Sequence, residues 1–239
     1  MVEHPQSAAL RGPTFMRLLA RLADLEVAQP GPSLPDRLGQ WIEWTHAVAL
    51  SRALDGTPSA PEPDGPGFGD ADEAECARMR AALADAIANG RGTTDAVPVD
   101  AAQAVADYAP FRQRHVELQR SMLTTTGYLR GHLRDRLARR SPDMARLADV
   151  DAVMERVLSP REQALLATVP ARLELHFERL RQSAQQAAAD APAQQQVPAS
   201  TSSGRWLDTF RNDMQAVLLA ELDVRFQPID GLLAALRTH

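Results

Sequence analysis

The sequence has 239 residues, a net charge of −5 and one cysteine, which exclude several classes of protein. No run approaches the ~18 consecutive apolar residues of a membrane-spanning helix, and one cysteine cannot build a disulfide scaffold. The N-terminus carries an acid and a proline where a secretory signal peptide has a basic start. We therefore expect a cytoplasmic protein of one globular domain or two small ones.

The composition favours helices over strands. Alanine and leucine contribute 70 residues, whereas isoleucine, valine, phenylalanine, tyrosine and tryptophan together contribute 28. All 26 basic residues are arginine, a bias that we attribute to codon usage rather than to anion binding. We predict an all-α protein, an irregular helical bundle of about six to eight helices with two disordered linkers.

Residues 1–56 predict an N-terminal helical hairpin. Apolar residues recur at helical spacing between residues 14 and 28, and Pro30, Gly31 and Pro32 then end the helix. A second helix is expected to begin at Ser33, whose hydroxyl is suited to capping, and to end before Gly56. The short connection between the two predicts an antiparallel pair.

Residues 57–75 predict the first linker, because they hold four prolines, six acids and no basic residue. Residues 76–182 then form the predicted central bundle, in which the strongest periodic signal runs unbroken from Phe111 to Arg140. A capping box at Ser159 predicts a new helix there, bent near Pro170.

The C-terminal part begins with the second predicted linker at residues 183–204, which lack large apolar side chains until Val197 and are rich in alanine, glutamine and serine. Residues 205–239 recover an apolar stripe and predict a C-terminal helix that packs on the bundle, with Pro228 dividing it from a final short helix.

The sequence predicts no catalytic residue, no cofactor and no metal site. No two histidines have the spacing of a helical metal pair, and no nucleophile elbow, phosphate-binding loop or HExxH motif is present. His115 and His176 lie on apolar faces near Glu117 and Glu174, so an enzyme whose site is assembled by tertiary contacts stays one alternative. Cys76 is expected to be a small buried residue.

The basic end of the 111–140 helix is the strongest charge asymmetry. Eight arginines face two acids between Phe111 and Ser141. Five of them lie close together: Arg130, Arg134, Arg136, Arg139 and Arg140. They suggest a nucleic-acid-associated regulator as a second alternative. A solvated helix end that complements the helix dipole is the commoner outcome, and the acidic 57–75 segment offers a partner within the same chain. The overall acidity argues against nucleic acid as a partner.

Two apolar features complete the candidate partner-binding residues. Trp41 and Trp44 lie three residues apart, so an exposed member of the pair would mark a protein-binding surface. The long 111–140 stripe, if its end is uncovered, predicts an antiparallel homodimer with Leu129 and Leu133 near its centre.

The segment FMRLLARLADLEVAQPGPSLPDRLGQWIEWTHAVALSRAL, above all its LGQWIEWTHAVALSRAL part, resembles the opening of an uncharacterised proteobacterial family of unknown function. The resemblance is best over residues 14–54 and carries no catalytic or binding residues. Members of that family are encoded near membrane proteins of the flagellar-motor or proton-channel type and near peptidoglycan-binding outer-membrane proteins, which implies an accessory role. The prolines between Gln29 and Pro35 depart from the family pattern.

Taken together, these features predict a non-enzymatic helical interaction module, an adaptor or accessory subunit in the cytoplasm that binds a protein partner, with a homodimer as one form. The amphipathic helices and the two linkers favour this class. No direct insertion into a membrane is expected.

Overall fold

The computed structural model describes residues 14–23, 34–55, 69–89, 107–190 and 199–238. All secondary structure in these residues is helical, so the expected all-α fold is confirmed. The helices are α1 (Thr14–Ala23), α2 (Leu34–Trp41), α3 (Trp44–Asp55), α4 (Asp70–Ala88), α5 (Ala109–Arg140), α6 (Pro142–Leu166), α7 (Val169–Ala189) and α8 (Ala199–Thr238).

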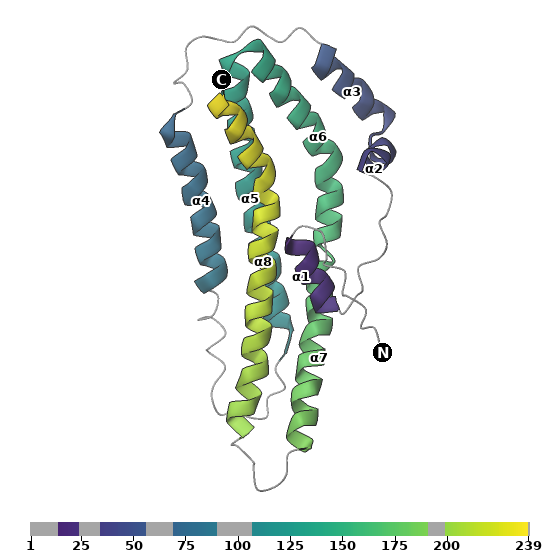
Figure 1. The fold of residues 1–239 in the computed structure, drawn as a ribbon, viewed down its shortest axis with the longest axis vertical. Helices are drawn as coiled ribbons and strands as arrows, with labels where there is room; N and C mark the ends of the chain where they lie inside the picture. The colour runs from purple at the N-terminus through teal and green to yellow at the C-terminus, as the bar shows by residue number, and fades with distance from the viewer. Residues whose placement is uncertain (1–13, 24–33, 56–68, 90–106, 191–198, 239) are drawn as a thin grey trace, which may run out of the picture.

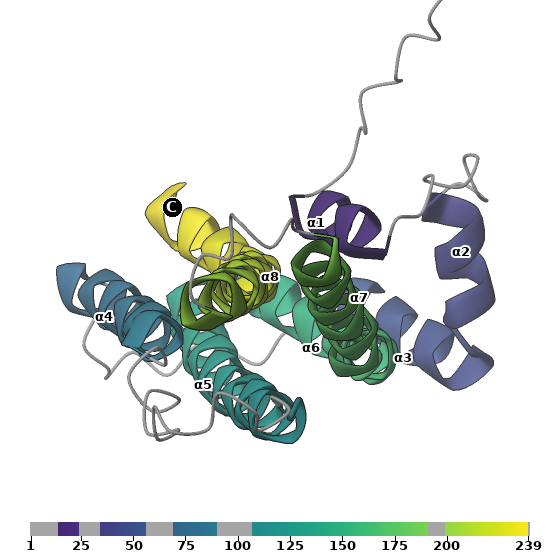
Figure 2. The same ribbon diagram turned by 90° about the horizontal axis from the view of Figure 1, so that it is seen from below.

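The C-terminal helix α8 is the centre of the molecule (Figures 1 and 2). It packs on α5, α7, α4 and α1, while α6 runs back along α5. Ser141 is the single residue between α5 and α6, and its side chain accepts a hydrogen bond from the Met144 amide at 3.2 Å. This N-cap satisfies one of the amides left unpaired at the start of α6 and fixes the sharp reversal of the chain.

The periodic stripe predicted for the middle of the chain forms the core side of α5. Leu118, Met122, Leu129, Leu133 and Leu137 are all buried. Between Met122 and Leu129 the buried residue is Thr126 rather than the expected Thr125. The Thr126 hydroxyl donates to the Met122 carbonyl at 2.8 Å, which satisfies a buried polar group within the helix.

An aromatic cluster fills the end of the bundle where α5, α7 and α8 meet. The rings of Phe177 and Phe210 lie 5.0 Å apart at 83°, and Phe111 is 5.2 Å from Phe210. The Tyr108 hydroxyl, just before α5, donates to the Pro170 carbonyl at 2.5 Å. Edge-to-face packing of this kind adds to the free energy of burying the rings. The hydrogen bond from Tyr108 joins the first turn of α7 to the start of α5.

Three prolines act differently from the prediction. α6 continues through Pro160 to Leu166, and α8 continues through Pro228 to Thr238, so neither proline ends its helix. The helix break lies at Ala167 and Thr168, and Pro170 is in the first turn of α7, where its missing N–H removes no helical hydrogen bond. In α6 the guanidinium of Arg161 donates to the Val157 carbonyl at 2.9 Å, in the turn before Pro160.

The N-terminal part also differs from the expected hairpin. The predicted second helix is two helices, α2 and α3, interrupted at Ile42 and Glu43. Moreover, α1 packs on α8 and α7 whereas α3 packs on α6, so the two parts of the predicted pair contact different helices (Figure 1). Ser33, the expected cap, lies outside the described residues.

Both predicted linkers are shorter than expected. α4 begins at Asp70, inside the 57–75 segment. At the second linker, α7 runs to Ala189 and α8 begins at Ala199, so helix covers much of residues 183–204. The remaining parts of these segments lie outside the described residues.

Candidate functional site

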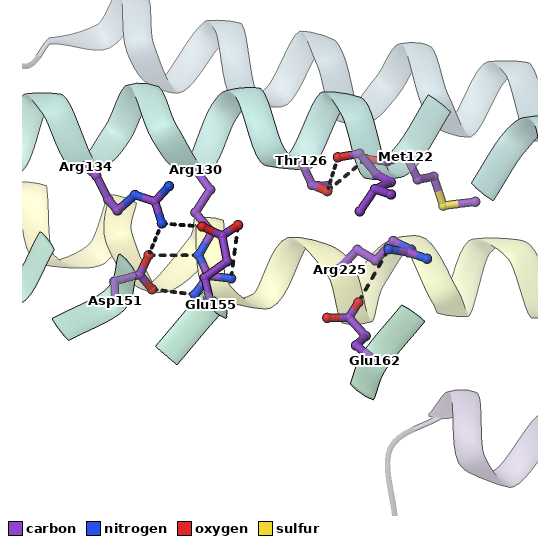
Figure 3. Close-up of polar contacts among 9 residues, drawn as sticks. Met122, Thr126, Arg130, Arg134, Asp151, Glu155, Glu162 and Arg225 are labelled. Atoms are coloured by element: carbon purple, nitrogen blue, oxygen red, sulfur yellow. Dashed lines mark hydrogen bonds and ion pairs between the residues drawn. The ribbon is translucent and has the colours of Figure 1, made fainter. Parts of the chain in front are cut away.

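Two arginines of the predicted basic end lie against acids of α6. Arg130 makes a two-pronged contact with Asp151, with Nε 2.8 Å from Oδ2 and Nη2 2.7 Å from Oδ1. Arg134 reaches the same Asp151 at 3.4 Å and also pairs with Glu155. Figure 3 shows the four side chains meeting between the two helices. These arginines therefore hold α6 onto α5.

Arg136 points to the other side of α5, toward α4. Its Nε and Nη2 both lie 3.2 Å from Oδ1 of Asp72, and His132 Nε2 lies 2.9 Å from the same oxygen. Burial raises the pKa of Asp72, but hydrogen bonds from His132 and the Gly69 amide and the charge of Arg136 outweigh it and hold the pKa below its usual value. Asp72 belongs to the acidic 57–75 segment, so one acid of that segment does contact the basic end.

The last two arginines of the group lie at the end of α5. The Arg140 guanidinium donates to the Leu236 carbonyl near the end of α8, while Arg139 is exposed. Four of the five arginines therefore join α5 to α4, α6 or α8. The structure brings the five together only as neighbours on one helix, and their side chains point to different partners.

The burial of Leu129 and Leu133 contradicts their predicted place at the centre of a homodimer interface. Both side chains have 0% exposure, because α5 is covered by α4, α6, α7 and α8 of the same chain. An apolar residue already enclosed by its own chain offers no surface to a second copy. The predicted antiparallel interface through residues 111–140 is therefore wrong at its centre.

The two tryptophans have different surroundings. The Trp41 ring lies under the guanidinium of Arg161, 5.5 Å from the ring centroid, which ties the end of α2 to α6. Trp44 begins α3 and is 82% exposed. Leu54, near the other end of α3, is 57% exposed. Of the sequence-predicted site residues, Trp44 is the apolar one that faces solvent.

A buried polar layer that no sequence motif predicted crosses the bundle where α5, α6 and α8 pack. We define it as His115, Gln119, Glu221 and Arg225. Arg225 Nη2 lies 2.9 Å from Glu221 Oε1, and Gln119 Nε2 donates to Glu221 Oε2 at 3.0 Å. Glu221 has no exposed surface. At the rim, Glu162 of α6 lies 3.5 Å from Arg225, as Figure 3 shows.

His115 lies beside this ion pair as a neutral ring. Its Nε2 is 3.8 Å from Glu221 Oε2, and neither ring nitrogen makes a hydrogen bond to a described residue. Burial, together with the positive charge of Arg225, lowers the pKa of His115 to about 4. Burial raises the pKa of Glu221 above its usual value, against the opposing effects of Gln119 and Arg225.

A sequence signal for the layer does exist. Glu221 and Arg225 are four residues apart and share the spacing of Leu218, Leu222 and Phe226, so both fall near the apolar face of their helix. Only their interruption of that face distinguishes them from the other acids and arginines of the chain.

The surroundings of His176 and Cys76 indicate a role in packing rather than in catalysis. His176 Nε2 pairs with Asp213 Oδ2 at 2.9 Å and not with Glu174, which is exposed. Likewise His115 faces Glu221 rather than Glu117, which accepts a bond from Gln113. Cys76 is buried, as predicted, and burial together with nearby carboxylates raises its pKa.

The described residues hold neither a group of metal ligands nor a membrane-spanning helix. No three side chains among His, Cys, Asp and Glu in the described ranges are grouped as metal ligands. Within the same ranges, every helix is too short or too polar to cross a bilayer.

A family model covers nearly the whole chain. Residues 1–238 match the model of a family described as a protein of unknown function, DUF3348. No curated protein and no solved structure matches the chain. The match agrees with the expectation, from the resemblance over residues 14–54, of a family of unknown function. The chain belongs to the DUF3348 family.

Proposed function

We propose that the protein is a non-enzymatic helical interaction module, an adaptor or accessory subunit that binds a protein partner in the cytoplasm. The observation that carries this proposal is the exposure of Trp44, 82% of whose surface faces solvent at the start of α3. Tryptophan is among the residues that contribute most to protein–protein binding when it is covered by a partner. An exposed tryptophan is therefore the residue of this surface whose covering by a partner would contribute most to binding.

The position of α3 supports the same proposal. α2 and α3 lie at the side of the bundle, where α3 packs on α6 (Figures 1 and 2). Trp41 under Arg161 and buried Ala53 attach this pair of helices to the bundle. Trp44 is thereby presented on a fixed helix, so a partner would lose little free energy in ordering it.

The two alternatives have less support. A nucleic-acid regulator would need the basic end of α5 to meet phosphate, yet Arg130, Arg134 and Arg136 are paired with acids inside the chain. An enzyme would need a substrate to reach a reactive group, and the strongest titratable pair, His115 and Glu221, has 0% exposed side-chain surface.

The family resemblance indicates the kind of partner. Because the similar family is encoded near membrane proteins, we place the partner in a membrane-associated assembly to which this chain attaches as an accessory subunit. In this proposal the partner, and not the chain itself, contacts the membrane.

Affinity purification from the native cell tests the proposal. Three forms of the full chain serve as bait: the wild type, Trp44→Asp, and Leu175→Asp. Leu175 is 66% exposed on α7 and provides a matched control for adding a charge to an exposed apolar site. We expect a partner that is retained by the wild type and Leu175→Asp and lost by Trp44→Asp. Equal recovery of all partners by the three baits would contradict the role of Trp44.

A further inference from the structure

α1 is a short amphipathic helix seated on two longer helices. It has 10 residues and packs on α7 and α8 (Figure 2). Phe15 and Leu22, seven residues and therefore two turns apart, are 7% and 4% exposed and join the hydrophobic core. A helix of this length is marginal in water on its own. The surface of α7 and α8 therefore stabilises the helical form of α1.

This surface also contacts the polar groups at the end of α1. The guanidinium of Arg179 on α7 donates to the Leu22 carbonyl, one of the last carbonyls of the helix, which have no partner within it. Arg21 pairs with Asp213 on α8 at 3.5 Å, and its side chain is 66% exposed. We define the faces of α7 and α8 on which α1 packs, with Arg179, His176 and Asp213, as the α1 groove.

The charged groups of the α1 groove keep partners when α1 is absent. Asp213 is also 2.9 Å from His176 Nε2, and Arg179 also donates to the Leu175 carbonyl at 3.3 Å. Departure of α1 therefore exposes apolar surface without leaving a charge buried and unpaired, which is the costly outcome for a receptor surface. An exposed apolar groove rimmed by matched charges is suited to binding a helix.

We propose that the α1 groove is a docking site for an amphipathic helix of a partner protein, and that α1 occupies it until the partner displaces it. α1 itself indicates the chemistry of the partner. The partner helix has two large apolar residues seven positions apart and a basic residue next to the second, opposite Asp213. This site is separate from Trp44 and adds a second surface to the proposed function.

The covalent link between α1 and the rest of its own chain favours a partner helix, rather than the α1 of a second copy, as the competing occupant of the groove. Residues 24–33 join α1 to α2 in the same chain, and a short connection of this kind gives an effective concentration near the millimolar range. The α1 of a second copy makes the same contacts without that advantage, so it does not compete at micromolar concentration. A partner helix longer than 10 residues is more stable as a helix before it binds, so it loses less free energy on ordering than α1 does and can compete.

Direct binding of a labelled peptide tests the groove. The probe is a fluorescein-labelled synthetic peptide of residues 12–25. The proteins are the full-length wild type, full-length Phe15→Asp/Leu22→Asp, in which α1 cannot dock, and full-length Met16→Asp, a matched control whose position is 57% exposed on the same helix. We expect the double variant to bind the peptide at least tenfold more tightly than the wild type and Met16→Asp, because only its groove is empty.

Two further changes test recognition of the basic residue. Adding Asp213→Asn to the double variant, or replacing Arg21 by Glu in the peptide, should weaken binding severalfold, as expected for one partly exposed ion pair. Equal binding of the peptide by the double variant and the wild type, with the helical circular dichroism of the double variant retained, would overturn the proposal.

A second preparation covers the case in which the double variant does not fold. A protease site inserted into residues 24–33 of the otherwise wild-type chain allows the tether to be cut after folding. The labelled peptide should then exchange with the cut α1. A cut fragment that neither leaves nor exchanges shows that α1 is a fixed part of the core and overturns the proposal. A wild-type dimer that dissociates on adding the peptide would assign the groove to a second copy and overturn the choice of partner.

Discussion

Arg225 and Glu221 lie one turn apart on α8 and form an ion pair of 2.9 Å in which Glu221 is completely buried. Gln119 of α5 stabilises this pair, because its Nε2 donates to both carboxylate oxygens of Glu221, at 3.2 and 3.0 Å. Gln119 also donates to the Leu166 carbonyl at the end of α6, at 3.2 Å. One polar layer therefore connects α5, α6 and α8 at the level where α6 gives way to α7.

Removing one member of this pair should destabilise the fold strongly. Glu221→Leu leaves Arg225 without its main partner, and Arg225→Met leaves a buried carboxylate, so each should lower the free energy of unfolding by about 3–5 kcal/mol. The double variant should lose much less than the sum of the two, because neither charge is then left alone. Urea denaturation of the four proteins measures the cycle. Single variants that cost less than about 1 kcal/mol would contradict the buried arrangement.

His115 should make the protein less stable in mild acid. Its pKa is lowered to about 4 by burial and by Arg225, whereas the unfolded chain has a pKa near 6.5. The unfolded state therefore binds the proton more tightly, and the contribution of the neutral ring to stability is complete above pH 6.5 and is lost as the pH falls toward 4. The full effect is at most about 3 kcal/mol.

The pH effect is measured as a difference from a variant, since other groups titrate in the same range. Glu221, with its raised pKa, favours the folded state as the pH falls and opposes His115. Subtracting the unfolding free energy of His115→Gln from that of the wild type at each pH removes most of these contributions. We expect this difference to decrease between pH 6.5 and 4; a constant difference would show that His115 keeps its ordinary pKa.

Leu129 should affect stability and not association. It is completely buried on α5, so Leu129→Ala should cost about 2–5 kcal/mol through lost burial and a cavity. Leu123 lies on the same helix with 40% exposure, and Leu123→Ala should cost less than about 1 kcal/mol. Denaturation gives both values. A fall in sedimentation mass caused by Leu129→Ala at unchanged stability would reinstate an interface at this position.

Two glycines in α5 lower its stability without a packing role. A Cβ built at Gly127 or Gly131 meets no atom within 4 Å. Glycine inside a helix is less favourable than alanine by roughly 0.5–1 kcal/mol, so Gly127→Ala and Gly131→Ala should each raise the unfolding free energy by about that amount. Gly69 is the control, because it is the N-cap of α4, where alanine is poorer than glycine. Gly69→Ala should therefore lower the stability, and a loss on Gly131→Ala would contradict the open surroundings of that residue.

The sequence by itself determined the helices whose signals are local. The spacing of Leu118, Met122, Leu129, Leu133 and Leu137 placed one face of α5 in the core, and all five are buried. Ser141 before Pro142 marked the turn into α6, and its side chain caps that helix. These features depend on residues within one or two turns of each other, so the order of the residues is enough to find them.

The prolines were misplaced because sequence rules describe an isolated helix. Pro160 and Pro228 each remove one hydrogen bond, yet α6 and α8 continue through them. Val157, one turn before Pro160, and Ile229, directly after Pro228, are 1% and 0% exposed. Burial of an apolar face against other helices outweighs the free energy lost at one proline.

The candidate sites were decided by the tertiary structure. In the sequence, nothing distinguishes Arg130 and Arg134 from the exposed Arg139. Only the placement of Asp151 and Glu155 on α6 gives the first two their partners. Likewise Trp44 faces solvent while Trp41 lies under Arg161, although they are three residues apart. Helical periodicity states which residues share a face, but which helix covers that face depends on contacts between segments far apart in the chain, and these are fixed only when the bundle assembles.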